Sequence, residues 1–380
     1  MKKQMKILVA PNAFKDCLSG FEVASAIERG IRRVAPNADV VKCPVADGGD
    51  GFLDVLEQSL NCTRIYHQVN NPLFKCINAE FLYLREQKTA IIEMAKASGL
   101  ALLKIEERNA IQTTTYGTGE LIKKALDIGA EKIYLGLGGS ATCDGGIGIL
   151  TALGVVFLNK KGLQLKPVGC SLPDIKRIDT SNLDPRILSS EFIMVCDVEN
   201  PLLGVNGAAK VFAPQKGASP DEVEFLEDGL RNLASIIKSD TSLDINIIGG
   251  GAAGGISATL YGLIGGKLKK GIDTIIDILD ISEKIKGSDL AITGEGKIDG
   301  QTAFGKAPAG IAALAKMHNI PCIAIAGLIG GDIDELYKIG FTSIFPICRG
   351  PMTLEDSIKN ADKLISESIE QIVRLLAFTS

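Results

Sequence analysis

Histidine is scarce in this chain: only two occur among its 380 residues, His67 and His318. Both stand in ordinary strand or helix-end contexts. Catalysis by a histidine base is therefore not expected. A carboxylate is the better candidate for a general base, because Asp and Glu also serve in that role.

Three other absences narrow the class of protein. The nine cysteines are odd in number and include no Cys-x-x-Cys pair, so neither a disulfide framework nor a zinc site is predicted. No apolar run approaches the roughly 20 residues of a membrane span, and the apolar stretch near the start reads as a first strand rather than a signal peptide. The formal net charge of −4 gives no reason to expect a nucleic-acid partner. We expect a cytoplasmic globular protein of two domains, for which a homodimer is one allowed state.

Glycine, by contrast, is concentrated in four loops that follow apolar, strand-like runs. They are residues 46–51 (ADGGDG), 138–148 (GGSATCDGGIG), 248–255 (IGGGAAGG) and 293–306 (TGEGKIDGQTAFGK). Glycine lets the backbone approach an anion closely and turn its N–H groups inward. Carboxylates and lysines in three of these loops suit a magnesium-bound phosphate. Together the loops predict a phosphate-handling enzyme.

The two ends of the chain alternate strand and helix. Near the start, strands are predicted at 6–10, 40–45 and 64–69, with a capped helix from Ser19 to 34 and another at 51–60. This βαβαβ order implies parallel pairing. The last hundred residues repeat the alternation and close with one amphipathic helix from 354 to about 377. The middle contains a predicted hairpin at 81–84 and 90–95. The simplest arrangement is a discontinuous α/β domain, made of the two ends, with the middle inserted.

The loop at 138–148 lies between a predicted strand and a predicted helix, where anions bind in α/β folds. It matches neither the G-x-x-x-x-G-K-[ST] phosphate loop nor a clean G-x-G-x-x-G dinucleotide motif. Ser140 and Thr142 could donate hydrogen bonds to phosphate, and Asp144 could approach magnesium. The alternative is a tight turn in which Asp144 caps the next helix.

Two further loops carry candidate side chains. Asp197 follows a buried strand and is itself followed by Asn200, Asn206 and Lys216 in a loop broken by glycine and proline. The alternative is that these are turn residues.

Loop 293–306 contains two carboxylates and two lysines that could ligate magnesium and neutralise phosphate. The alternative for this loop is a solvated surface loop. Lys15, Asp16, Asp47 and Asp50 follow the first two strands, where plain surface charges are the alternative. For loop 248–255, close backbone approach to a ligand and to a neighbouring helix both stay open.

In this order the segments resemble the bacterial type I glycerate kinases nearly end to end. The segments that carry the resemblance are APNAFKDCLSGFEVA, PVADGGDG, IEMAKASGL, TTTYGTGELI, GLGGSATCDGGIGILTALG, CDVENPL, NGAAKVFAPQKGA, GGGAAGG and ITGEGKIDGQTAFGKAP. The resemblance implies two α/β domains: a discontinuous flavodoxin-like (Rossmann-like) domain, residues 1–80 plus 285–380, and an inserted restriction-endonuclease-like domain, residues 81–284. It places the active site in the cleft between them.

The activity that the resemblance implies is ATP-dependent phosphorylation of D-glycerate to 2-phosphoglycerate, with Mg²⁺. The same kinase giving 3-phosphoglycerate is one alternative. A non-catalytic sensor of phosphorylated hydroxy acids is another, and a nucleotide-dependent oxidoreductase is disfavoured because the residues after the first strand are NAFKDCLSG. Four positions depart from the family pattern: Asn12, Asp16, Cys143 and Phe304. Asn12 is not expected to act as a base, and Phe304 excludes a histidine-dependent step there.

Site roles follow from charge and position. Asp197 is the first choice for the carboxylate that orients or deprotonates the attacking hydroxyl, Asp47 is the second, and Lys15 completes the catalytic set. The predicted phosphate or nucleotide ligands are Gly138, Gly139, Ser140, Thr142, Lys216, Glu295 and Lys306. The predicted glycerate ligands are Asn200, Asn206, Gln301 and Arg349, and the predicted magnesium ligands are Asp144 and Asp299.

Overall fold

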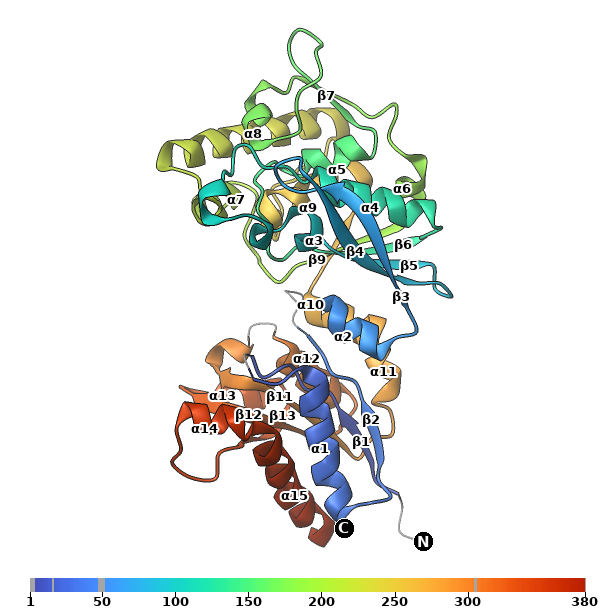
Figure 1. Ribbon diagram of the computed structural model, residues 1–380, viewed down its shortest axis with the longest axis vertical. Helices are drawn as coiled ribbons and strands as arrows, with labels where there is room; N and C mark the ends of the chain where they lie inside the picture. The colour runs from blue at the N-terminus through green and yellow to red at the C-terminus, as the bar shows by residue number, and fades with distance from the viewer. Residues whose placement is uncertain (1–3, 16, 47–51, 304–305, 380) are drawn as a thin grey trace. The chain divides into compact units, whose positions relative to one another are not determined.

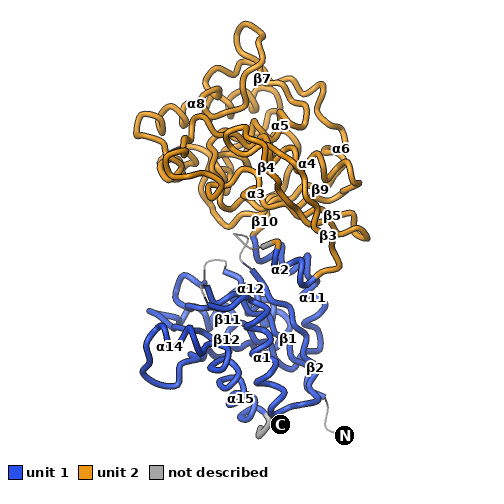
Figure 2. Tube along the Cα trace, in the orientation of Figure 1, with its two compact units in different colours: residues 1–47, 54–59, 271–380 blue, residues 48–53, 60–270 orange. Residues whose placement is uncertain are grey.

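The computed structural model describes residues 4–15, 17–46, 52–303 and 306–379. The chain divides into two compact α/β units (Figure 2). Unit 1 consists of residues 1–47, 54–59 and 271–380, and unit 2 of residues 48–53 and 60–270. Each unit has its own sheet and its own hydrophobic core.

Unit 1 is built on a five-stranded sheet in the order β2-β1-β11-β12-β13, and all its pairs are parallel. The strands are β1 (Lys6–Val9), β2 (Asp39–Lys42), β11 (Leu290–Asp299), β12 (Cys322–Gly330) and β13 (Phe341–Pro346). After β1 the chain forms β2, which pairs with one edge of β1. The later strands β11, β12 and β13 lie on the other side of β1. This reversal between β1 and β11 is a topological switch point, where ligands bind at the carboxyl ends of parallel strands.

The helices of unit 1 are α1 (Gly20–Val34), α2 (Phe52–Ser59, grouped with this unit from Asp54), α10 (Gly271–Ile278), α11 (Ile281–Lys284), α12 (Ala307–Met317), α13 (Asp334–Ile339), α14 (Leu354–Lys359) and α15 (Ala361–Thr379). Helices α1 and α15 lie side by side (Figure 1), and their apolar faces share a core with alternate residues of β1, β11 and β12. Helix α12 contacts β11 and β12.

The start of α1 confirms the predicted capping box, because Ser19 Oγ accepts from Glu22 N and the Glu22 carboxylate accepts from Ser19 N. The predicted C-terminal helix is divided in two: α14 ends at Lys359, Asn360 caps it, and α15 begins at Ala361.

Unit 2 is built on a six-stranded mixed sheet in the order β10-β9-β6-β5-β4-β3. Its strands are β3 (Thr63–Asn70), β4 (Cys76–Leu84), β5 (Thr89–Glu93), β6 (Lys132–Gly136), β9 (Glu191–Val195) and β10 (Lys267–Lys269), and a small second sheet joins β7 (Val156–Leu158) to β8 (Arg177–Asp179). The helices are α3 (Ala95–Ser98), α4 (Tyr116–Asp127), α5 (Ile147–Ala152), α6 (Pro185–Ser189), α7 (Ala208–Phe212), α8 (Pro220–Thr241) and α9 (Ile256–Ile264). The predicted hairpin is confirmed as β4 and β5, with Leu82 opposite Ile91.

Strand β3 corrects one prediction. The expected parallel βαβαβ unit is wrong at its third strand, because β3 pairs antiparallel with β4 along its whole length, from Thr63↔Tyr83 to Asn70↔Cys76. The compact units accordingly change over near residues 59 and 270 rather than at the predicted 80 and 284. At the second boundary, α10 belongs with unit 1 because Ile272 packs against Gly310 of α12.

A stability prediction follows from the contact of α1 with α15. Gly30 lies in the middle of α1, and a Cβ there would come within 2.8 Å of Ile369 Cβ and closer still to the Ser366 carbonyl oxygen. Gly30→Ala should lower the free energy of unfolding by about 1–3 kcal/mol through overpacking, although alanine favours a helix by about 1 kcal/mol. Urea unfolding measures the effect. Ser25→Ala, on the same helix and only partly buried, should change little; equal stability of the two variants would contradict the packing argument.

Candidate functional site

The switch point of unit 1 brings the loop after β1 against β11. Asn12 N donates to Gly294 O at 2.8 Å, and a Cβ on Gly296 would lie 3.5 Å from Lys15 N. Strand β11 continues past the end of β1, so residues 293–299 carry charged side chains beyond the carboxyl edge of its neighbour. Lys15 is exposed at this edge. The second predicted base, Asp47, lies outside the described residues, as do Asp16, Asp50 and Phe304.

The charged side chains of the β11 segment are arranged in two pairs. Glu295 is 7% exposed; its Oε1 accepts from Thr302 Oγ1 at 2.7 Å and lies 3.7 Å from Lys306 Nζ. Lys297 Nζ lies 2.8 Å from Asp299 Oδ2. That hydrogen bond holds the pKa of Asp299 below its usual range. Glu295, Lys297 and Asp299 alternate along the strand and so share one face.

Two other predicted residues of unit 1 are placed less centrally. Gln301 is exposed, and its backbone N donates to Asp299 Oδ1 at 3.0 Å. Arg349 follows β13, which is separated from β11 by β12, and its guanidinium pairs with Glu367 of α15 at 3.1 Å. The structure therefore groups Lys15, Glu295, Asp299, Gln301 and Lys306, and it leaves Arg349 in an ion pair two strands away.

In unit 2 the carboxyl ends of four parallel strands stand in register. Glu93, Gly136, Val195 and Lys269 are Cα partners across β5, β6, β9 and β10. The segments that follow stay hydrogen bonded, since Leu137 N donates to Val195 O at 3.1 Å. The structure thus brings the loop with Gly138, Gly139 and Ser140 to the same sheet edge as Asp197.

Asp144 is fully buried beneath that loop, and both of its oxygens accept hydrogen bonds. Oδ1 accepts from Gly146 N at 3.0 Å. Oδ2 accepts from Thr115 N and Thr115 Oγ1, both at 2.8 Å, and from Gly148 N at 3.3 Å. Burial raises the pKa of this carboxyl, while these donors act in the opposite direction. The donors enclose the carboxylate, and this favours a structural role in place of the predicted magnesium ligand.

The third glycine loop supports the second. Gly145 N donates to Gly254 O at 3.1 Å. Gly254 and Gly255 have φ values of +75° and +95°, and a Cβ on Gly254 would overlap the backbone of Thr142 and Cys143. Of the two alternatives left open for residues 248–255, a ligand and a neighbouring helix, this contact matches neither, because the close approach is to the loop that precedes α5. Cys143, one of the departures from the family pattern, is buried in the same place.

Lys216 also lies beneath the loop, at 2% exposure. Its Nζ donates to Ser140 Oγ and to Thr142 O, both at 2.7 Å. Burial lowers the pKa of this ammonium. The structure therefore brings Ser140, Thr142 and Lys216 into contact, and the lysine faces the protein interior instead of solvent; their role as phosphate ligands stays a prediction.

The residues after β9 remain at the surface. Asp197 and Asn206 are exposed, and Asn200 is half-buried with its Nδ2 donating to Asn206 O at 2.8 Å. Asn200 O in turn accepts from Gly251 N at 2.9 Å. The Asn200 side chain thus bridges the turn through the Asn206 carbonyl oxygen, and Asp197 stands at the start of the turn; both asparagines as glycerate ligands stay predictions.

Sequence reasoning missed three polar residues of these sites: Glu93, Thr115 and Thr302. Glu93 ends β5 in the register described above, is 6% exposed and accepts from Leu53 N at 3.0 Å. Thr115 holds Asp144, and Thr302 holds Glu295. All three occur in segments that carry the family resemblance, and a buried strand ending in glutamate was a usable signal for Glu93.

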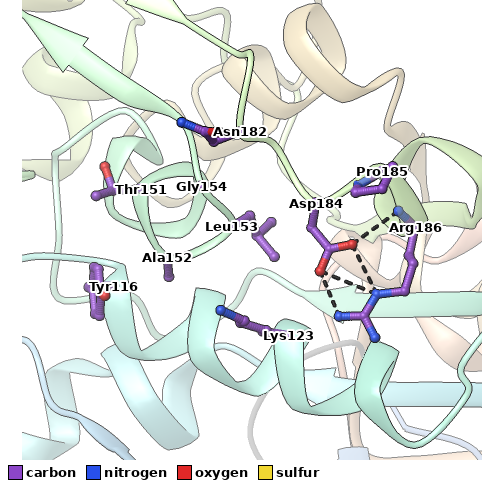
Figure 3. Close-up of a pocket in the computed structure, with 10 residues that line it drawn as sticks. All are labelled: Tyr116, Lys123, Thr151, Ala152, Leu153, Gly154, Asn182, Asp184, Pro185 and Arg186. Atoms are coloured by element: carbon purple, nitrogen blue, oxygen red, sulfur yellow. Dashed lines mark hydrogen bonds and ion pairs between the residues drawn. The ribbon is translucent and has the colours of Figure 1, made fainter.

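One pocket of unit 2, with a cavity volume of about 570 Å³, contains none of the predicted site residues. It is lined by Tyr116, Lys123, Thr151, Ala152, Leu153, Gly154, Asn182, Asp184, Pro185 and Arg186. In Figure 3 the Arg186 guanidinium points toward the Asp184 carboxylate, with which it forms a 2.6 Å ion pair. Its charge is therefore neutralised within the protein.

Among the described residues, no cluster of three acidic, histidine or cysteine side chains could hold a metal, and no described helix is both long and apolar enough to cross a membrane.

Comparison with known proteins gives a consistent match along the chain. A family model described as the glycerate kinase family matches residues 7–377. The chain is 43% identical to the glycerate kinase of Bacillus cereus, with 99% of each chain covered. It is 41% identical to the glycerate 2-kinase of Escherichia coli, with 98% of each covered. A crystal structure assigned as glycerate kinase 2 from Salmonella typhimurium LT2 superposes with a TM-score of 0.90 at 40% identity, covering 99% of both chains.

The contacts of Asp144 generate a prediction that separates its two roles. Asp144→Asn replaces an acceptor by an amide donor that opposes the N–H groups around it, so the free energy of unfolding should fall by about 2 kcal/mol or more without any ligand. Urea unfolding in EDTA measures this, with Asp228→Asn on the exposed side of α8 as the matched control. A metal ligand alone would leave the metal-free stability unchanged or raise it, and that result would restore the magnesium role.

Proposed function

The chain belongs to the glycerate kinase family, and from this premise we propose that it transfers the terminal phosphoryl group of ATP to the 2-hydroxyl group of D-glycerate. The observation that carries the proposal is the shared sheet edge of unit 2. There a rigid glycine loop and the exposed carboxylate of Asp197 follow neighbouring parallel strands. Phosphoryl transfer needs little covalent help from a protein, and it depends on positioning and on neutralising charge.

We assign Asp197 the role of orienting or deprotonating the attacking hydroxyl. Its position beyond β9 supports this role, because an exposed carboxylate can reach a bound hydroxyl while the buried Asp144 cannot. Gly138, Gly139 and Ser140 would bind phosphate, and Asn200 and Asn206 would shape the glycerate subsite. Asp47 remains the second choice for the base and stays a prediction.

Unit 1 supplies the second half of the proposal. Its strand order, counted within the unit, is 2-1-3-4-5, which is the flavodoxin-like order with a switch point between the first and third strands. This supports the flavodoxin-like architecture; the restriction-endonuclease-like assignment of unit 2 and the location of the site in the interdomain cleft stay predictions. The Glu295–Lys306 and Lys297–Asp299 pairs suit a magnesium triphosphate, since lysines attract phosphate oxygens and carboxylates attract the metal.

Mg²⁺ is commonly held by one or two carboxylates together with substrate phosphates and water, so a cage of three acidic residues is not required. Glu295 and Asp299, on one face of β11, fit that donor set. When bound, the metal would neutralise charge on the transferring phosphate. Lys15 and Lys306 would act on the same phosphates from the loop after β1 and from the start of α12, and Gln301 and Arg349 stay predicted glycerate ligands. The cytoplasmic location and the homodimer also stay predictions.

The reaction and its regiochemistry form one prediction. Incubation of the full chain with ATP, Mg²⁺ and D-glycerate should produce ADP and 2-phosphoglycerate, which ³¹P NMR distinguishes from the 3-phosphate. A 3-phosphate product would correct the hydroxyl assignment and keep the kinase. Binding of phosphorylated hydroxy acids without any glycerate-dependent ADP would indicate the sensor alternative and refute the proposal.

The role of Asp197 gives a separate prediction. Asp197→Asn keeps the size of the side chain and removes its charge, so kcat should fall by about 10² or more if the carboxylate acts as base. Asp228→Asn serves again as control, because Asp228 is an exposed aspartate of the same unit. A coupled ADP assay gives kcat and KM for both. Near-normal turnover of Asp197→Asn would remove Asp197 from this role and move the assignment to Asp47.

A further inference from the structure

The ammonium group of Lys216 is a buried cation with a specific pair of acceptors. Its side chain is 2% exposed, and Nζ donates to Ser140 Oγ and Thr142 O at 2.7 Å each. Among the described residues, no carboxylate lies within ion-pair distance of this nitrogen. Burying a charge without an ion-pair partner is unfavourable for stability. A lysine ammonium kept beneath a glycine loop is therefore expected to have a function that offsets this cost in stability.

The direction of the Ser140 hydrogen bond has a chemical consequence. A lysine ammonium has three donors and no acceptor, so Ser140 Oγ must be the acceptor in this pair. The proton of the serine hydroxyl then has to point elsewhere. Within the part of the chain that the structure describes, no acceptor for that proton is found, and Ser140 is 8% exposed. Donation by the ammonium also polarises the hydroxyl and makes it a stronger donor.

The backbone beside Ser140 offers matching donors. The N–H groups of Gly138, Gly139 and Ser140 have no acceptor among the described residues, and both glycines are exposed. Gly139 has a φ of +69°, a left-handed conformation of the kind that turns successive N–H groups toward one anion. The segment at residues 98–100 holds the loop by two backbone hydrogen bonds. Leu100 N donates to Gly139 O at 2.8 Å, and Ala141 N donates to Ser98 O at 2.9 Å.

A second hydroxyl in the same loop is also unsatisfied. Thr142 Oγ1 is fully buried and has no hydrogen-bond partner among the described residues. Buried hydroxyl groups are nearly always paired; at 0% exposure this hydroxyl lies beneath the loop, like the Lys216 ammonium, and is not placed to contact the anion itself. The loop thus combines unpaired backbone donors and the Ser140 hydroxyl with a buried positive charge, which is the chemistry of an anion site.

We propose that Lys216 is a positioning residue that acts on a phosphate group of the nucleotide through Ser140, by holding the serine hydroxyl as a donor toward an oxygen bound at the Gly138 and Gly139 N–H groups. The inference rests on the proposed function for the identity of the anion. It replaces direct contact between Lys216 and phosphate, which the burial of the ammonium excludes, with a relay through the hydroxyl of Ser140, a residue that is 8% exposed.

Calorimetric titration of Mg²⁺-ATP into the full chain tests the serine. Ser140→Ala should weaken binding about tenfold or more, because it removes a hydrogen bond to a charged group. Ser140→Thr, which keeps a hydroxyl, should recover most of the affinity. Ser171→Ala is the matched control, since Ser171 is also 8% exposed and lies in the same unit. Wild-type affinity in Ser140→Ala would overturn the proposal.

A double-variant cycle tests the relay. Lys216→Met should weaken Mg²⁺-ATP binding in the wild-type background and add less than about twofold to Ser140→Ala, since contacts that act as one unit are not additive. Lys210→Met, which removes a lysine paired with Glu224 on the surface, should leave binding unchanged. Independent, multiplying losses would mean that Lys216 acts on the nucleotide without Ser140, contrary to the proposal. If circular dichroism shows Lys216→Met to be unfolded, the Ser140 variants decide alone.

The two proposals can fail separately. A wild-type chain that produces no glycerate-dependent ADP, together with weakened Mg²⁺-ATP binding in Ser140→Ala, would refute the proposed function and retain this inference. Normal kinase activity together with unchanged binding in Ser140→Ala would refute this inference alone.

Discussion

The loop that joins β6 to α5 is organised by a carboxylate with no contact to solvent. The two oxygens of Asp144 accept hydrogen bonds from Thr115 and from the glycine turn, and these bonds hold the loop to the segment that carries Thr115. Lys216 adds a buried positive charge, which donates to Ser140 and Thr142 of the same loop. Burying ionised groups is unfavourable unless they are hydrogen bonded, and the bonds that Asp144 and Lys216 make hold the backbone of the loop in place. A preorganised backbone is what phosphate binding needs, because no reorganisation is then left for the moment of reaction.

The two units use the same physical device at separate places. Parallel strands direct their carboxyl ends, and the loops that follow, to one edge of a sheet. In unit 1 that edge has Lys15, Glu295 and Lys306 near a switch point, and in unit 2 it has the glycine loop and Asp197. Glycines are needed where backbones approach closely, as at Gly254 against Thr142. Asp197 and Lys15 stand in the segments that follow strands, where they are exposed, whereas Glu295 is buried within β11 beyond the end of β1.

Much of this arrangement could be predicted from the sequence, and the failures have physical causes. The Ser19 cap and the β4–β5 hairpin are local signals and were confirmed. Strand β3 was predicted at the right place in the chain but with the wrong pairing. Alternation of side chains indicates that a segment is a strand, but it does not show which strand pairs with it. The inward orientation of Asp144 depends on Thr115, 29 residues earlier, and that of Lys216 on Ser140, 76 residues earlier. Contacts between residues so far apart produce no periodic pattern in the sequence. The residue types therefore identified these side chains as candidates, but they could not predict their roles.

A crystal structure of the full chain with Mg²⁺ and a non-hydrolysable ATP analogue tests most directly whether buried charges preorganise this loop for phosphate. The account predicts a phosphate oxygen within hydrogen-bond distance of the Gly138 and Gly139 N–H groups and of Ser140 Oγ, with Asp144 and Lys216 keeping their present contacts. A nucleotide whose phosphates bind elsewhere while this loop stays empty would contradict it.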